Sequence, residues 1–253
     1  MPIESSFPHG SPIWVDLQSS DPAGAAAFYR ALFDWEVEPP AADTNGYALA
    51  TRRGVPVSAI GPLPEGERPR WTTYFAVDDI AAAADAVLGA GGAVLLPPGE
   101  LIPGVTLSIV ADPAGAVLGL WQSHAASSWL RDEPGAVDWL ELVAPDIESV
   151  FPFYEAVLGV GASEMRVADE PYGLFDVADR SVAGAYRSDG SEPAHWLVYL
   201  NVADLDATVV RATELGGTLR TEPTAAAGVG RWAEIVDPQG ATVALLEPEP
   251  EPA

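Results

Sequence analysis

The 253-residue sequence contains no cysteine and no lysine, although it contains 12 arginines. The absence of cysteine excludes disulfide bonds, thiolate catalysis, zinc–thiolate sites and iron–sulfur clusters. The absence of lysine excludes lysine Schiff-base chemistry and a Walker-type phosphate loop. No apolar run approaches the ~18 residues that cross a bilayer, and the start, Met-Pro-Ile-Glu-Ser-Ser, does not read as a signal peptide. The sequence therefore predicts a soluble cytoplasmic protein.

Positive charge is also scarce, because 12 basic residues face 37 acidic ones and the formal net charge is −25. Binding to a nucleic acid requires Lys and Arg to replace the counterions of the phosphates, so this chain would repel it. An anionic membrane surface is excluded as a partner for the same reason. The charge favours a cationic or neutral small molecule. The hydrophobic content of 48% is enough for a folded core and excludes a disordered chain.

The chain contains an internal repeat with an offset of 125 residues. Landmarks of the first half that recur at this offset are Trp14 as Trp139, Phe28-Tyr29 as Phe153-Tyr154, Trp71 as Trp196, Tyr74 as Tyr199 and Asp112-Pro113 as Asp237-Pro238. A single offset over more than a hundred residues indicates a tandem duplication. We expect modules at 12–124 and 136–247, a Pro/Gly/Ser-rich tail at 1–11, a linker at 125–135 and an extended C-terminal tail.

Each module is predicted to contain strands and two helices. In the first, residues 12–19 alternate as a strand, and Asp21 followed by Pro22 is typical of a helix start. The remaining elements expected there are strands near 47–51, 55–60 and 71–77, a helix at 80–88, and a hairpin of 105–111 with 116–121. The fold class is α+β.

The repeated segments resemble the vicinal oxygen chelate superfamily, which includes glyoxalases, bleomycin-resistance proteins and extradiol dioxygenases. The matching segments are SDPAGAAAFYRALFDW and APDIESVFPFYEAVLG, WTTYFAVDDI and WLVYLNVADL, and DPAGAVLGLWQ and DPQGATVALLE. Within the superfamily, the chain looks like a two-module actinobacterial glyoxalase-like subgroup. The resemblance implies tandem paired βαβββ modules, each a curled mixed sheet that forms an open cup with helices on the outside.

The metal-dependent relatives implied by this resemblance take ligands from three strand positions. In this chain those positions hold Trp14, Thr72 and Gly119 in the first module and Trp139, Leu197 and Ala244 in the second. None of these side chains is a good donor for a divalent metal. His9, His124 and His195 lie in the tail, at the linker and just before a strand. We therefore predict no metal, no cofactor, and neither glyoxalase nor ring-cleaving dioxygenase chemistry.

Strand alternation indicates which side chains face the cups. Each cup should carry a Trp, a carboxylate two residues later and a Tyr. The candidate catalytic residues are Asp16 and Glu141, and the candidate ligand-binding residues are Trp14, Gln18, Thr72, Tyr74, Trp121, Trp139, His195, Tyr199 and Asn201. The same alternation directs Trp71 and Trp196 toward the helices, and it leaves Tyr47 and Tyr172 unassigned. The first cup is the more polar and aromatic, so it is the expected site if only one functions.

The Trp, carboxylate and Tyr that recur in each cup, referred to below as the trio, support two functions. A carboxylate beside aromatic faces can capture a cationic or polyaromatic metabolite or antibiotic. Alternatively, burial would raise the carboxylate pKa and allow metal-independent acid/base chemistry, as in an isomerase, cyclase or lyase of natural-product metabolism. Alternatively, Asp16 and Glu141 have only a structural role. A third, non-catalytic hypothesis is that the protein is a subunit scaffold, but this would leave the polar residues of the cups unexplained. Binding of a small molecule is the favoured hypothesis. The sequence is compatible with a homodimer but does not predict one.

Overall fold

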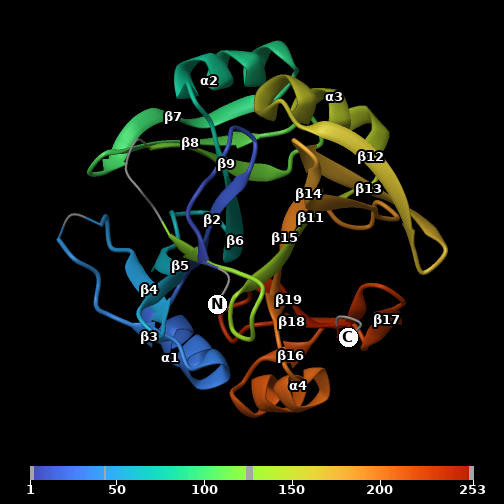
Figure 1. Cartoon of the computed structure of the whole chain (residues 1–253). Coiled ribbons are helices and arrows are strands. Elements are labelled where there is room, and N and C mark those ends of the chain that lie inside the picture. The colour runs from blue at the N-terminus through green and yellow to red at the C-terminus, as the bar shows by residue number, and fades with distance from the viewer. Residues whose placement is uncertain (1–2, 43, 124–127, 251–253) are drawn as a thin grey trace.

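The computed structural model describes residues 3–42, 44–123 and 128–250. The expected end of the first module at residue 124, His124, residues 125–127 of the expected linker and the last three residues of the C-terminal tail lie outside this part. The described chain forms four α-helices, two large mixed sheets and a small two-stranded sheet (Figure 1). None of these four helices is long and apolar enough to cross a membrane.

The first large sheet has eight strands in the order β3-β4-β5-β2-β6-β9-β8-β7. The strands are β2 (Pro12–Ser19), β3 (Glu36–Val37), β4 (Ala48–Arg52), β5 (Val55–Pro62), β6 (Arg70–Ala76), β7 (Ala93–Ile102), β8 (Val105–Ala111) and β9 (Val117–Ser123), with helices α1 (Pro22–Phe33) and α2 (Ile80–Gly89). Strand β2 pairs with β5 and β6 pairs with β9 in parallel, whereas β2 and β6 are antiparallel. The sheet therefore consists of two βαβββ units joined along β2 and β6.

The second large sheet repeats this plan in the order β12-β13-β14-β11-β15-β19-β18-β16, with β17 paired to β18. Its elements are β11 (Val137–Ala144), α3 (Ile147–Leu158), β12 (Gly161–Val167), β13 (Glu170–Val177), β14 (Arg180–Arg187), β15 (His195–Asn201), α4 (Leu205–Glu214), β16 (Thr218–Leu219), β17 (Thr224–Ala226), β18 (Gly230–Val236) and β19 (Thr242–Pro248). The predicted α+β fold of tandem βαβββ modules is confirmed.

The repeated aspartates have local structural roles. Asp21, Asp79, Asp146 and Asp204 are the N-caps of α1, α2, α3 and α4, and each accepts a hydrogen bond from a backbone N–H of the first turn. Such caps satisfy donors that the helix itself leaves unpaired. Asp112 and Asp237 close the predicted turns before the last strand of each sheet, and they accept hydrogen bonds from Ala116 and Ala241.

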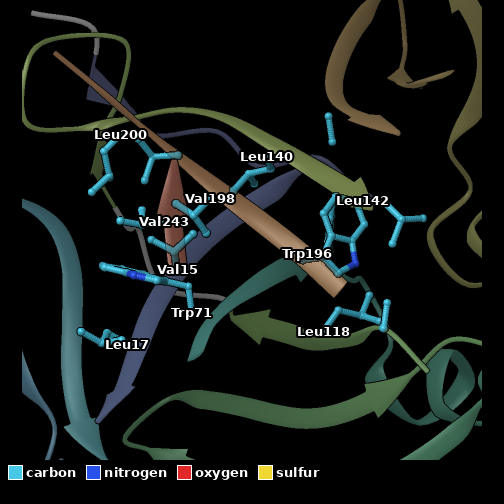
Figure 2. Close-up of a cluster of buried hydrophobic side chains, with 14 of the residues drawn as sticks. Val15, Leu17, Trp71, Leu118, Leu140, Leu142, Trp196, Val198, Leu200 and Val243 are labelled. Carbon is cyan, nitrogen blue, oxygen red and sulfur yellow. The ribbon is translucent and has the colours of Figure 1, made fainter. Parts of the chain in front are cut away.

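The main hydrophobic core lies between the two sheets. Figure 2 shows Val15, Leu17 and Trp71 from the first sheet against Val198, Val243 and Trp196 from the second. The Trp71 ring contacts Tyr29 of α1 and the Trp196 ring contacts Tyr154 of α3, so both indoles face the helices, as strand alternation predicted. Helix α1 packs beside α4 and α2 beside α3, at the two ends of this layer (Figure 1). Since one face of each sheet is used for this packing, the opposite faces carry the two cups.

Two reciprocal hydrogen bonds join the modules within this core. Tyr154 of α3 donates to Asp112 of the first module at 2.9 Å, and Tyr29 of α1 donates to Asp237 of the second at 3.2 Å. Each tyrosine hydroxyl also accepts from a core indole, Trp196 or Trp71. Each turn aspartate thus accepts hydrogen bonds from its own turn with Oδ1 and from a tyrosine of the neighbouring module with Oδ2.

We expect Tyr154→Phe to lower the free energy of unfolding by about 1–3 kcal/mol, because it leaves the Trp196 indole N–H and one Asp112 oxygen buried without a partner. Urea denaturation followed by circular dichroism would measure the change. Tyr29→Phe is the matched variant at the other contact and should lose a similar amount. An unchanged midpoint for both variants would show that these bonds do not stabilise the module pair.

The N-terminal tail contains a short strand, and Trp129 and Leu130 of the linker are buried. Strand β1 (Ile3–Glu4) pairs antiparallel with β10 (Trp129–Leu130), and Gly10 donates a backbone hydrogen bond to Ala76. Trp129 and Leu130 are fully buried. The N-terminal segment and the linker therefore both pack against the modules. The two segments together form one wall of a pocket described below.

Candidate functional site

The central strands β2 and β11 place the Trp and carboxylate residues on the cup faces. Trp14 lies opposite Tyr74 and Asp16 opposite Thr72 across β2 and β6. Trp139 lies opposite Tyr199 and Glu141 opposite Leu197 across β11 and β15. The trio predicted from strand alternation is therefore assembled in both modules.

In the first cup, the Tyr74 hydroxyl donates a hydrogen bond to Asp16 Oδ2 at 2.7 Å. Gly119 makes this position possible, since a Cβ there would lie 2.0 Å from the Tyr74 ring. Burial raises the pKa of Asp16 to about 7, although the Tyr74 hydrogen bond and the Arg70 charge oppose the shift. Tyr47, unassigned from the sequence, accepts a hydrogen bond from Gln18 Nε2 at 3.2 Å.

Aromatic rings surround this carboxyl group. The Trp121 ring lies 6.4 Å from Trp14 and 5.9 Å from Tyr74, measured between ring centroids. Four polar atoms here are buried and have no hydrogen-bond partner among the described residues: Asp16 Oδ1, Gln18 Oε1, Thr72 Oγ1 and Trp121 Nε1. Since buried polar groups normally find partners, these atoms are suited to ordered water or a ligand.

In the second cup, Glu141 is held by two tyrosines. Tyr172 donates to Glu141 Oε2 at 2.8 Å and Tyr199 donates to Oε1 at 2.9 Å. The Trp139 indole N–H donates to the Tyr172 hydroxyl at 2.9 Å, so a continuous chain runs from indole to carboxyl group. Gly184 leaves room for Tyr172, because a Cβ there would lie 1.9 Å from the hydroxyl oxygen. Burial raises the pKa of Glu141 to about 7 against the effect of both tyrosines.

A cavity of about 310 Å³ opens beside this carboxyl group. Its walls come from β11, the β12–β13 hairpin, β14, β15 and the β17–β19 region, and the lining residues are Asp138, Trp139, Glu141, Met165, Val167, Tyr172, Leu174, Ser181, Tyr199, Gly228, Val229, Trp232, Leu246 and Pro248. Most of this wall is apolar or aromatic, as is usual for small-molecule sites.

The long β12–β13 hairpin distinguishes the second cup from the first. Strands β12 and β13 have 7 and 8 residues, whereas their counterparts β3 and β4 have 2 and 5. Pro39-Pro40 lies one residue beyond the end of β3, and proline cannot donate ladder hydrogen bonds, so the first hairpin stays short. Met165, Val167 and Leu174, which the sequence analysis did not select, therefore extend the wall of the second cup only.

A β-bulge changes the residues that line the second cup. The register of β11 against β15 shifts between Val137 and Trp139, and both Asp138 and Trp139 line the cavity. Simple alternation directs Asp138 away from the cup, so the sequence analysis missed it. The Asn201 side-chain amide donates a hydrogen bond to Asp138, and Asn201 is not among the residues that line the cavity. Asn201 therefore positions Asp138 instead of facing the cavity directly.

His195 also lies away from the cavity wall. It begins β15, and its Nδ1 lies 2.9 Å from the carbonyl oxygen of Pro193. The other predicted residues of the second cup, Trp139, Glu141 and Tyr199, line the cavity together. Trp14, Gln18, Thr72, Tyr74 and Trp121 gather around Asp16 in the first cup. The functional roles assigned to all these residues stay predictions.

The comparisons with known proteins identify the family. Residues 13–120 match the glyoxalase-like domain, and residues 136–245 match the glyoxalase/bleomycin resistance protein/dioxygenase superfamily. The protein named "Putative glyoxylase CFP32" of Mycobacterium tuberculosis is 38% identical over 99% of this chain and 100% of its own length. The chain belongs to the glyoxalase/bleomycin resistance protein/dioxygenase superfamily, as its repeated segments indicated.

Other relatives include an anthracycline biosynthesis protein, DnrV, of Streptomyces peucetius. It is 34% identical over 95% of this chain and 94% of its own length. Among solved structures, the Mn(II)-bound glyoxalase of Novosphingobium aromaticivorans superposes with a TM-score of 0.65 at 19% identity, covering 94% of this chain and 82% of that one. The 2,3-dioxygenase LapB of Pseudomonas has a TM-score of 0.67 at 13% identity, covering 96% and 93%. These two structures share the fold.

The residues of this chain do not fit the divalent metal of such relatives. The three expected ligand positions carry an indole, a hydroxyl and no side chain in the first module, and an indole and two aliphatic groups in the second. In the first cup, the ring of Tyr74 lies against Gly119, the position from which the third ligand would extend. Across the described ranges, no group of three or more His, Asp or Glu side chains is arranged to hold a metal ion.

Proposed function

We propose that the two modules, 12–124 and 136–247, form a small-molecule-binding protein that captures a cationic or polyaromatic compound in the second cup. One observation carries this proposal: the cavity combines the aromatic rings of Trp139, Tyr172, Tyr199 and Trp232 with a buried carboxyl group. Flat aromatic ligands pack well against such rings, and a cation over an indole gains about 0.5–2 kcal/mol. The net charge of −25 adds long-range attraction for cations.

The names of two relatives support the polyaromatic class. Both the Streptomyces peucetius protein and its counterpart from Streptomyces strain C5 are named anthracycline biosynthesis proteins. The sequence favoured the first cup because it is the more polar and aromatic of the two, whereas the proposed site is the cavity in the second cup. A cytoplasmic location stays a prediction.

The proposal predicts that proflavine, a planar aromatic cation whose charge lies on the ring system itself, quenches the tryptophan fluorescence of this protein saturably. Glu141→Gln should weaken binding by about tenfold to a hundredfold above pH 7, because a charge-assisted interaction contributes about 1.5–3 kcal/mol. Isothermal titration calorimetry measures the affinity of each variant.

Asp16→Asn is the matched control, since Asp16 is the counterpart carboxylate of the first cup and also accepts from a tyrosine. It should leave the affinity unchanged. If Asp16→Asn weakens binding and Glu141→Gln does not, the ligand occupies the first cup. If proflavine, daunorubicin and other planar aromatic cations all fail to bind, the proposal is wrong.

One observation favours a second candidate, a metal-independent acid/base enzyme. The pKa of Glu141 is raised to about 7 by burial at the wall of a cavity, which suits a general acid or base near neutral pH. Mass spectrometry of the recovered ligand separates the two functions. An unchanged mass and retention time indicate capture, whereas a product that disappears in Glu141→Gln while binding persists indicates catalysis.

A further inference from the structure

A second pocket of about 440 Å³ lies next to the aromatic cavity. The two share Asp138, Trp139 and Ser181 as lining residues, so they are adjacent. The N-terminal segment, from Glu4 to Pro12, forms one wall of the second pocket. Its size admits a substituent as large as a monosaccharide ring.

The character of the second pocket is different, because charged groups of both signs line it. Arg131 and Arg180 contribute two guanidinium groups, and Glu4, Asp132 and Asp138 contribute three carboxylates. A simple anion would meet more negative than positive charge there, and a simple cation would meet the two arginines. Neither kind of ion is complementary to the whole surface.

The ion pairs in this pocket are loose. Arg180 lies 3.8 Å from Glu4, and Arg131 Nε lies 3.8 Å from Asp132 Oδ1. Both separations exceed hydrogen-bond distance, so the charged groups keep donors and acceptors for another molecule. Nε of Arg131 is buried and has no hydrogen-bond partner among the described residues.

Arg131 is held in place by its other contacts. Its Nη2 donates to the backbone carbonyl of Asp138 at 2.9 Å, and its guanidinium carbon lies 4.6 Å above the ring of Trp129. Burial lowers the pKa of Arg131, against the attraction of Asp132, Glu4 and Asp138. A guanidinium fixed in this way is a preorganised donor whose desolvation has already occurred on folding.

Hydroxyl groups fit such a surface, because each one donates to a carboxylate and accepts from a guanidinium. Resting on the function proposed above, we propose that this second pocket binds a hydroxyl-rich, sugar-like substituent of the ligand whose aromatic part occupies the cup. The protein would then select aromatic glycosides over the corresponding aglycones.

The experiment compares daunorubicin, its sugar-free aglycone daunorubicinone, and N-acetyldaunorubicin, in which the ammonium charge is removed. We expect both glycosides to bind at least about tenfold more tightly than the aglycone. The double variant Glu4→Gln/Arg180→Ala should reduce this ratio toward one while the aglycone affinity stays constant. Arg180 is 78% exposed, so the variant should fold.

Arg187→Ala is the control, since Arg187 lies at the other end of β14 and lines neither pocket. It should keep the wild-type ratio. Equal affinities for aglycone and glycosides would overturn the sugar pocket and leave the aromatic cavity standing. A preference that N-acetylation abolishes would also overturn it, because the ammonium group alone would then explain binding. If none of the three compounds binds, both proposals fail.

Discussion

Replacement of Trp129 by alanine is expected to lower the free energy of unfolding by about 3–5 kcal/mol, as for other large aromatic residues truncated in a core. The Trp129 indole is 1% exposed, and its N–H donates to the carbonyl of Val57 at 2.9 Å. It also packs 6.2 Å from the Trp14 ring and lies under the Arg131 guanidinium. Chemical denaturation at constant pH would measure the loss.

Trp129→Phe is the informative companion, because it keeps most of the packing and removes only the indole hydrogen bond. It should cost less than the alanine variant. Because Arg131 stacks on this ring, Trp129→Ala should also reduce the preference for glycosides described above. A loss below about 1 kcal/mol would contradict a substantial contribution of the buried Trp129 side chain to stability.

The stability of the protein is expected to fall as the pH rises from about 4 to 7. The pKa values of Asp16 and Glu141 are both about 7 in the folded state, against 3.8 and 4.5 for ordinary groups. The folded state therefore binds more protons than the unfolded state in this window, and this contribution is complete below pH 4 and lost above pH 7. Each group contributes on the order of 3–4 kcal/mol to the difference.

The groups that face these carboxyls do not reverse the sign. Tyr172, Tyr199 and Glu234 surround Glu141, and the two tyrosine hydrogen bonds lower its pKa less than burial raises it. Tyr74 and Arg70 act on Asp16 in the same direction as those tyrosines, and Tyr47 lies nearby. Burial of the carboxyl groups is the largest effect in both cups.

The measurement is urea denaturation at pH 5 and pH 8 for the wild type, Asp16→Asn, Glu141→Gln and the double variant. Each substitution should reduce the difference between the two pH values, and the double variant should reduce it most. An identical difference in all four proteins would show that neither carboxyl titrates near pH 7. The variants also control for general charge repulsion, which they leave almost unchanged.

Local patterns predicted most of the fold. The helix start at Asp21 followed from side-chain capping, which requires only neighbouring residues. The Asp112–Gly115 turn and the alternation of β2 are equally local. The pairing of the N-terminal tail with Trp129 and Leu130 could not be predicted in this way, because no local pattern specifies a partner over 120 residues away.

The candidate site could be predicted in part for the same reason. Strand alternation placed Trp139, Glu141 and Tyr199 on one face, and the cavity confirms that they lie together. The bulge in β11 places Asp138 in the cavity wall, although alternation directed it to the core. Asn201, which alternation placed in the cup, instead donates a hydrogen bond to Asp138. Tyr172 was unassigned because its hydroxyl reaches Glu141 over Gly184, a contact between separate strands.

The sequence by itself determined the duplication, the absence of thiol and lysine chemistry, the lack of metal-donor residues at the family positions, and the recurrence of Trp, carboxylate and Tyr. The lack of metal donors also rests on the resemblance to the family, and the other properties follow from residue types and their spacing. Only the tertiary structure decided that a cavity opens in the second cup, that Glu141 lies between two tyrosines, and that a charged pocket adjoins it. The reason is physical: the shape of these cavities depends on how segments far apart in the sequence, such as the β12–β13 hairpin and the N-terminal segment, come together around the sheet.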